Sequence, residues 1–141
     1  MQRIVLDTNV FAGALLREEG YNREVLRACL DDRWRPIMGQ ALFLEYEDVL
    51  GREPIFRNSP LSRAERSELF EAFLSVCDWV HVYYLWRPNL RDEGDNHVFE
   101  LAIAGGAQGI VTNNVADFRS ADLRFPDVQV LSPRDALRDL I

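Results

Sequence analysis

Two similar stretches, IVLDTNVFA at 4–12 and IVTNNVADF at 110–118, constrain the fold of this chain more than any other feature. Each begins with β-branched apolar residues that show no polar alternation, which is typical of a strand buried on both faces. Each then changes abruptly to Asp, Asn or Thr. Strands of this kind occur in parallel sheets that helices cover on both sides, so the polar residues are expected where two neighbouring strands end.

The other apolar runs continue an alternation of strands and helices. Strands are expected at 3–6, 35–39, 79–86, 109–112 and 128–131. Helices are expected at 10–16, from a cap at Asn22 through Leu30, at 41–50, after a capping box of Ser62 and Glu65, at 96–104, and after Ser132-Pro133. The pattern predicts an α/β fold with a mostly parallel sheet of about five strands. At 141 residues the chain fits a single domain, 1–141.

The charge balance limits how this chain can bind a polyanion. The net charge is −7, and all 16 basic residues are Arg. Proteins that bind nucleic acid by charge alone are usually basic, so a bound cation or a local group of Arg residues would be needed. The lack of Lys also argues against a phospho-receiver domain and a haloacid-dehalogenase-like phosphatase, and the latter would need Asp where the chain has Asn9.

Two further features concern the compartment. No window approaches the roughly 18 uncharged apolar residues that a membrane span needs, and the N-terminus shows no apolar secretion signal. We therefore expect a cytoplasmic protein without a membrane partner. Cys29 and Cys77 have no CxxC partners and are expected to be core thiols rather than a disulfide or a zinc site.

Acidic residues from separate segments could meet at the carboxyl ends of the strands, where ligands bind in such sheets. Asp7 follows the first strand, although it could equally be a helix N-cap. Glu45 borders the apolar face of helix 41–50, although a solvated acid is as good an interpretation. Asp95 is on the same side of its helix as Val98 and Phe99.

The neighbours of these acids suggest supporting roles. Asp92 stands one turn before Asp95 and is expected to cap its helix, and Asp117 follows the fourth strand. His97 is expected to be a surface or cap histidine. Two carboxylates about 5 Å apart repel by roughly 3 kcal/mol at an effective dielectric near 20, so a cluster of acids requires a cation. Because every candidate is an oxygen ligand, the cation is expected to be Mg²⁺ or Mn²⁺ rather than zinc.

The segments LDTNVFAGALL, LEYEDVL and DEGDNHVFELAIAGGAQGIVTNNVADF, in this order, resemble the PIN-domain ribonucleases, which include the VapC-like toxins of toxin–antitoxin pairs. The resemblance covers nearly the whole chain and implies a three-layer α/β/α sandwich that holds Mg²⁺ or Mn²⁺ and cleaves single-stranded RNA. It makes Asp7, Glu45 and Asp95 the catalytic acids and metal ligands. Asn9 matches a residue that orients the first Asp, and Thr112 matches a supporting hydroxyl.

The sequence departs from the family pattern at Asn114, where many relatives have a fourth Asp. Asn114 and Asp117 are retained as candidate metal ligands, since an amide oxygen can bind a cation but adds no charge. The main hypothesis is a metal-dependent endoribonuclease, the toxin of a pair with a cognate antitoxin, and homodimers are common in this family. The alternative is a degenerate PIN domain that binds RNA or a protein without cleavage.

Overall fold

The computed structural model describes residues 1–82, 96–122 and 127–140, and in these ranges it contains a parallel five-stranded sheet in the order β3-β2-β1-β4-β5. The strands are β1 (Gln2–Leu6), β2 (Trp34–Met38), β3 (Asp78–Trp79), β4 (Gly109–Val111) and β5 (Gln129–Leu131). The helices are α1 (Thr8–Leu16), α2 (Tyr21–Leu30), α3 (Gln40–Leu50), the 3₁₀ helix η1 (Glu53–Phe56), α4 (Arg63–Val76), α5 (Asn96–Ala104), α6 (Val115–Asp122) and α7 (Pro133–Asp139). The predicted α/β fold is confirmed.

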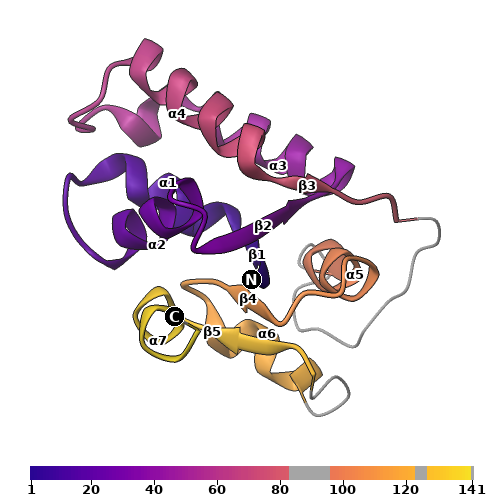
Figure 1. Ribbon diagram of the computed structural model, residues 1–141. Coiled ribbons are helices and arrows are strands. Elements are labelled where there is room, and N and C mark those ends of the chain that lie inside the picture. The colour runs from indigo at the N-terminus through magenta and orange to yellow at the C-terminus, as the bar shows by residue number, and fades with distance from the viewer. Residues whose placement is uncertain (83–95, 123–126, 141) are drawn as a thin grey trace.

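Helices cover the sheet on both sides, as the unbroken apolar strands require (Figure 1). On one side α1 packs against α2, and α2 packs against α7. On the other side α5 contacts β1, β2 and β4. The helices α3 and α4 lie over the end of the molecule that carries β3. The result is the three-layer α/β/α sandwich.

The order of the strands creates one topological switch beside β1. From β1 the chain moves outward to β2 and β3, and it then returns to the other side of β1 to form β4 and β5. Leu6 pairs with Val111, and the backbone N–H of Asp7 donates to the carbonyl of Val111 at 2.9 Å. Asp7 and Thr112 therefore leave the sheet side by side, at the position where sheets of this kind bind ligands.

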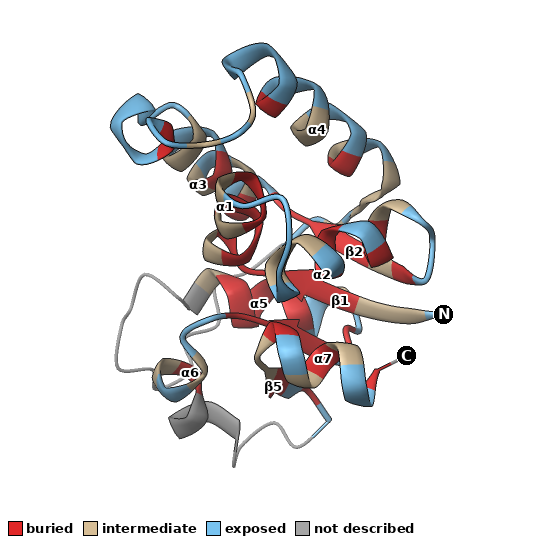
Figure 2. Cartoon of the chain, turned by 90° about the vertical axis from the view of Figure 1, so that its left-hand side faces the viewer, coloured by how far each residue is buried: buried red, intermediate tan, exposed pale blue. Residues whose placement is uncertain are grey.

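Strand β1 is at the centre of the core, and Figure 2 colours most of it as buried. Ile4, Val5 and Leu6 are completely or almost completely buried. Phe11 of α1 packs at 5.5 Å from Tyr46 of α3 and 5.2 Å from Phe73 of α4, measured between ring centroids. These contacts join three helices whose apolar faces would otherwise be exposed, and aromatic burial of this size contributes strongly to stability.

Tyr46 also connects the core to the edge where β1 ends. Its ring is buried, and its hydroxyl donates a 2.6 Å hydrogen bond to the carbonyl of Leu6, the last residue of β1. Burial raises the pKa of Tyr46 well above its ordinary value, so the hydroxyl remains a donor. Because Glu45 directly precedes Tyr46 on α3, this bond also fixes where the backbone of Glu45 lies relative to the end of β1.

Several local expectations differ from the structure. Helix α2 begins at Tyr21 after Gly20, whose φ of 119° favours glycine, so Asn22 lies inside the helix and is not its cap. Of the expected strand 79–86, Trp79 pairs with β2 as the second residue of β3, residues 80–82 are not a strand, and residues 83–86 lie outside the described residues. Helix α6 and η1 were not expected from the sequence.

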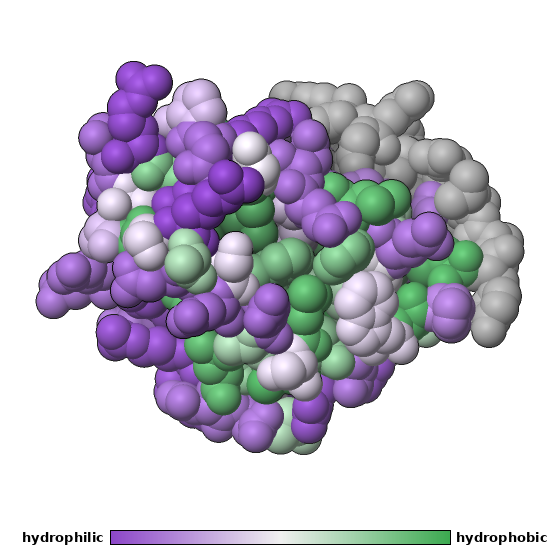
Figure 3. Space-filling model, turned by 90° about the horizontal axis from the view of Figure 1, so that it is seen from above, coloured by the Kyte–Doolittle hydropathy of each residue, from purple (hydrophilic) through white to green (hydrophobic). Residues whose placement is uncertain are grey.

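The outer surface carries both polar and apolar side chains. Seen from above, over α4, hydrophilic side chains surround an uneven area of hydrophobic ones (Figure 3). Leu44 and Trp79 are more than half exposed. None of the helices in the described part of the chain is long and apolar enough to cross a membrane.

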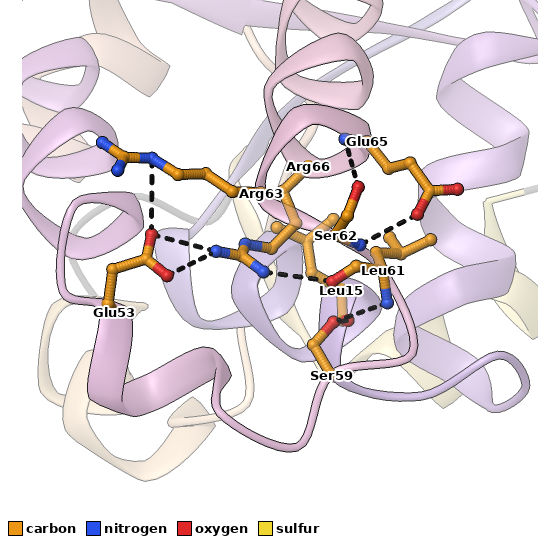
Figure 4. Close-up of polar contacts among 8 residues, drawn as sticks. All are labelled: Leu15, Glu53, Ser59, Leu61, Ser62, Arg63, Glu65 and Arg66. Atoms are coloured by element: carbon orange, nitrogen blue, oxygen red, sulfur yellow. Dashed lines mark hydrogen bonds and ion pairs between the residues drawn. The ribbon is translucent and has the colours of Figure 1, made fainter.

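A buried arginine holds the connection between α3 and α4 (Figure 4). Arg66 is 8% exposed, and its guanidinium donates to both carboxylate oxygens of Glu53 at 2.9 and 3.0 Å and to the carbonyl of Leu61 at 3.1 Å. It also lies 4.9 Å from the centre of the Phe56 ring. Helix α4 itself begins with the expected capping box of Ser62 and Glu65. Together these contacts fix η1 against the start of α4.

Replacing Arg66 with Met should lower the free energy of unfolding by about 2–3 kcal/mol, because the bidentate ion pair, the bond to Leu61 and the ring contact are lost together. Arg63 approaches the same Glu53 at 3.6 Å but has an 81% exposed side chain, so Arg63→Met should cost about 0.5 kcal/mol or less. Urea denaturation of both variants measures the difference. Equal losses would contradict the role given to Arg66.

Candidate functional site

Asp7 stands at the junction of β1 and α1 and is 4% exposed. It caps α1: one carboxylate oxygen, Oδ1, accepts the backbone N–H of Thr8 at 2.9 Å. The helix-cap interpretation of Asp7 therefore holds. It does not compete with a metal-ligand role, since a carboxylate has further lone pairs after this bond.

Thr112 and Asn9 hold the second carboxylate oxygen of Asp7. The hydroxyl of Thr112, which is completely buried at the end of β4, donates to Oδ2 of Asp7 at 2.8 Å. The amide of Asn9 donates to the same oxygen at 3.3 Å. The orientation of Asp7 is thus set by residues from both of the similar stretches in the sequence.

The second stretch forms a polar network around Asn9. The backbone N–H of Asn113 donates to Oδ1 of Asn9 at 3.1 Å, and the Asn113 amide donates to Asn22 Oδ1 at 3.2 Å. Asn22 packs closely on Gly13, where an added Cβ would lie 2.3 Å from the amide nitrogen of Asn22. Asn22 is predicted from the sequence only as a helix cap, and nothing in the local pattern indicates its contact with Asn113, which is 91 positions away.

Asn114 and Asp117 lie farther along the same edge. The backbone N–H of Asn114 donates to the hydroxyl of Thr112 at 3.0 Å, and the side chain of Asn114 is exposed. Asp117 is half-buried in the first turn of α6, and its backbone N–H donates to the carbonyl of Asn114. Their assignment as metal ligands stays a prediction.

Glu45 is held by a histidine from another helix. Nε2 of His97, at the start of α5, lies 2.6 Å from Oε2 of Glu45 on α3. The Glu45 side chain is 34% exposed and that of His97 is 22% exposed. His97 is therefore no simple surface or cap histidine. The contact arises from the packing of α3 against α5, which the sequence pattern of neither helix revealed.

The electrostatic environment of Asp7 disfavours its charge. Burial is the main cause, and it raises the pKa of Asp7 above 3.8, with a further increase from the carboxylate of Glu45. The hydrogen bonds from Thr112 and Thr8, and His97 when it is protonated, act in the opposite direction but do not cancel the effect. Two carboxylates that influence each other in this way would both be stabilised by a cation.

A groove is lined in part by His97, the residue that contacts Glu45. It has a volume of about 650 Å³ and lies between α3, β3 and α5. Trp79, Leu44 and Leu101 supply part of its apolar wall, and His97 and Glu100 supply polar groups.

Comparisons with known proteins agree with this architecture. The sequence pattern of the PIN domain family matches residues 3–116, which include β1, α3, α5 and β4. This chain belongs to the PIN-domain family. The structure of VapBC2 from Rickettsia felis, bound to a DNA fragment from their promoter, contains a chain with the same fold: the TM-score is 0.62 at 16% identity, over 93% of this chain and 98% of that chain. No curated protein matches the sequence.

The acidic cluster expected of this PIN domain can be located only in part. Asp92 and Asp95 lie outside the described residues. Within residues 1–82, 96–122 and 127–140, no group of three His, Cys, Asp or Glu side chains is arranged to hold a metal ion. Asp7 and Glu45 nevertheless supply two oxygen ligands of the kind that Mg²⁺ and Mn²⁺ prefer. Burial first, and Glu45 to a lesser degree, raise the pKa of Asp7, and a bound cation would favour its charged form.

The buried charge of Asp7 should make the metal-free PIN domain less stable as the pH rises. The folded-state pKa of Asp7 is raised above 3.8, so the folded state binds its proton more tightly than the unfolded state, and stability is lost between pH 3.8 and the folded pKa. Asp7→Asn carries no charge, so it should exceed the wild type in unfolding free energy at pH 7, with the difference shrinking towards pH 4. Urea denaturation in EDTA measures this.

The matched control for this experiment is Glu47→Gln, since Glu47 is an exposed acid on α3. This variant should follow the wild type at every pH. If Asp7→Asn is less stable than the wild type at pH 7, the hydrogen bonds that Asp7 accepts from Thr8 and Thr112 outweigh the cost of its buried charge, and the interpretation is wrong.

Proposed function

We propose that this PIN domain is a metal-dependent endoribonuclease that cleaves single-stranded RNA. The observation that carries the proposal is the buried carboxylate of Asp7, which is fixed by Thr112 and Asn9 at the topological switch and influenced by the charge of Glu45. A buried acid with a raised pKa at this edge of the sheet is a candidate for a functional site. PIN domains are generally nucleases, which agrees with this chemistry.

The protein groups have separate roles in the proposed reaction. Asp7 and Glu45, together with the expected third acid Asp95, would hold Mg²⁺ or Mn²⁺, which supplies a Lewis acid and an activated water when it is bound. Thr112 and Asn9 fix the orientation of the Asp7 carboxylate, which would hold the cation. Because the chain has a net charge of −7, the cation also offsets the repulsion between the acidic site and the RNA phosphates.

A half-exposed aromatic ring favours an unpaired substrate. Trp79 is 53% exposed in the wall of the groove that His97 also lines. Unstacked bases of single-stranded RNA bind to aromatic faces of this kind, whereas a duplex keeps its bases stacked on each other. The groove thus supports single-stranded RNA as the substrate class, which would be met in the cytoplasm.

We further propose that the protein is the toxin of a toxin–antitoxin pair. The support is the fold shared with a chain of the VapBC2 assembly, at an identity of 16%. A cognate antitoxin would cover the acidic edge, and an Arg placed between Asp7 and Glu45 would replace the cation. A homodimer remains part of this proposal. Trp34 is buried in the core and cannot contribute to such an interface.

The alternative function is a PIN domain that binds RNA without cleaving it. The observation that favours it is the exposed, uncharged side chain of Asn114 at a position where many relatives have an acid. In that case the protein would retain RNA affinity and would lack turnover with any divalent cation.

The cleavage experiment compares two glutamates on the same helix. With Mn²⁺ and an unstructured RNA, Glu45→Gln and Asp7→Asn should each lower the cleavage rate by about 100-fold or more, because each removes charge from the site. Glu47→Gln, on the exposed face of α3, should cleave at the wild-type rate. Gel-resolved cleavage of end-labelled RNA is the measurement. Intact RNA with wild-type protein across Mg²⁺, Mn²⁺ and pH would overturn the enzymatic proposal in favour of the alternative.

The toxin proposal has its own test. The product of a small reading frame next to the gene should co-purify with this protein, and its addition should suppress both RNA cleavage and Mn²⁺ binding, because its Arg would occupy the site of the cation. Cleavage assays and calorimetry with and without that product measure the two effects. A partner that binds and leaves Mn²⁺ affinity unchanged would contradict the proposed position of the Arg.

A further inference from the structure

The contact between His97 and Glu45 bridges two helices at the candidate metal site. It is short, at 2.6 Å, and both side chains are largely shielded from solvent. Glu45 is placed along α3 by the hydrogen bond of its neighbour Tyr46 to the end of β1, but that bond leaves the glutamate side chain free to rotate. Nε2 of His97 lies close enough to Oε2 of Glu45 to restrain that side chain.

The two ring nitrogens of His97 have different surroundings. Nδ1 is buried and has no hydrogen-bond partner among the described residues. Nε2 lies 2.6 Å from Oε2 of Glu45, within the distance at which a ring N–H can donate to a carboxylate. Nε2 is therefore the nitrogen through which His97 can act on Glu45.

We propose that His97 is a positioning residue for the metal site: through Nε2 it holds Oε2 of Glu45 and so fixes the carboxylate for binding a divalent cation. This inference rests on the proposed function. A partner on one oxygen of a carboxylate orients the group and leaves its other oxygen able to bind the cation. Hydrogen-bonded partners of ligating carboxylates have this role in metal sites generally.

The test measures Mn²⁺ affinity directly, from the signal of free Mn²⁺ in electron paramagnetic resonance. His97→Phe keeps a planar ring without a donor and should weaken binding about 10- to 100-fold. His97→Gln places an amide N–H near the position of Nε2 and should stay within about threefold of the wild type. In a Glu45→Gln background, His97→Phe should have no additional effect, because its influence passes through Glu45.

Two measurements separate positioning from loss of structure. Thermal unfolding in EDTA should show His97→Phe folded at the temperature of the assay, and Glu47→Gln should bind Mn²⁺ as the wild type does. Unchanged or tighter binding in folded His97→Phe overturns the inference; tighter binding would mean that His97 competes with the cation for Glu45. An equal loss in His97→Phe and His97→Gln overturns it as well.

The results distinguish this inference from the proposed nuclease activity. Wild-type protein that binds Mn²⁺, loses affinity in His97→Phe and leaves RNA intact would overturn the nuclease proposal alone. Wild-type protein that cleaves RNA, with normal Mn²⁺ affinity in His97→Phe, would overturn the role of His97 alone. Wild-type protein that does not bind Mn²⁺ would overturn both.

Discussion

The pairing of β1 with β4 is the constraint on which the candidate site depends. It brings together Asp7 and Thr112, which are 105 positions apart in the chain, and it places them where the sheet changes direction. A slip of the register by one residue would turn Asp7 away from the hydroxyl of Thr112 and expose apolar strand residues to solvent. The buried side chains of Ile4, Val5 and Leu6 oppose that slip. Packing of the core thus fixes the geometry of the polar edge.

The strands and the first acid were predictable because their signals are local. Apolar runs without alternation identified β1 and β4, and a sharp change to polar residues located Asp7 and Thr112 at their ends. The family resemblance then proposed which acids belong together. The capping box of Ser62 and Glu65 is equally local, since both of its hydrogen bonds lie within one turn of helix.

The features that the sequence did not reveal depend on contacts between distant segments or on weak local signals. His97 meets Glu45 only because α3 and α5 pack together, and no spacing within either helix encodes that contact. The expected strand at 79–86 rests on an apolar composition. Of its described residues, Trp79 pairs with β2, and it does so together with Asp78 at the edge of the sheet. Helix α6 has eight residues and few apolar ones, so its periodicity is too short to recognise.

The hydrogen bond from Tyr46 to Leu6 has a consequence for how this protein responds to heat. The Tyr46 ring stacks with Phe70 and Phe73. Its hydroxyl holds α3, the helix that carries Glu45, against the end of β1. Loosening of that stack would displace Glu45 while the hydrogen bonds between the strands remained intact. Warming would thus impair the acidic edge before the sheet melts, and the temperature limit of the site would be set by side chains that never touch a ligand.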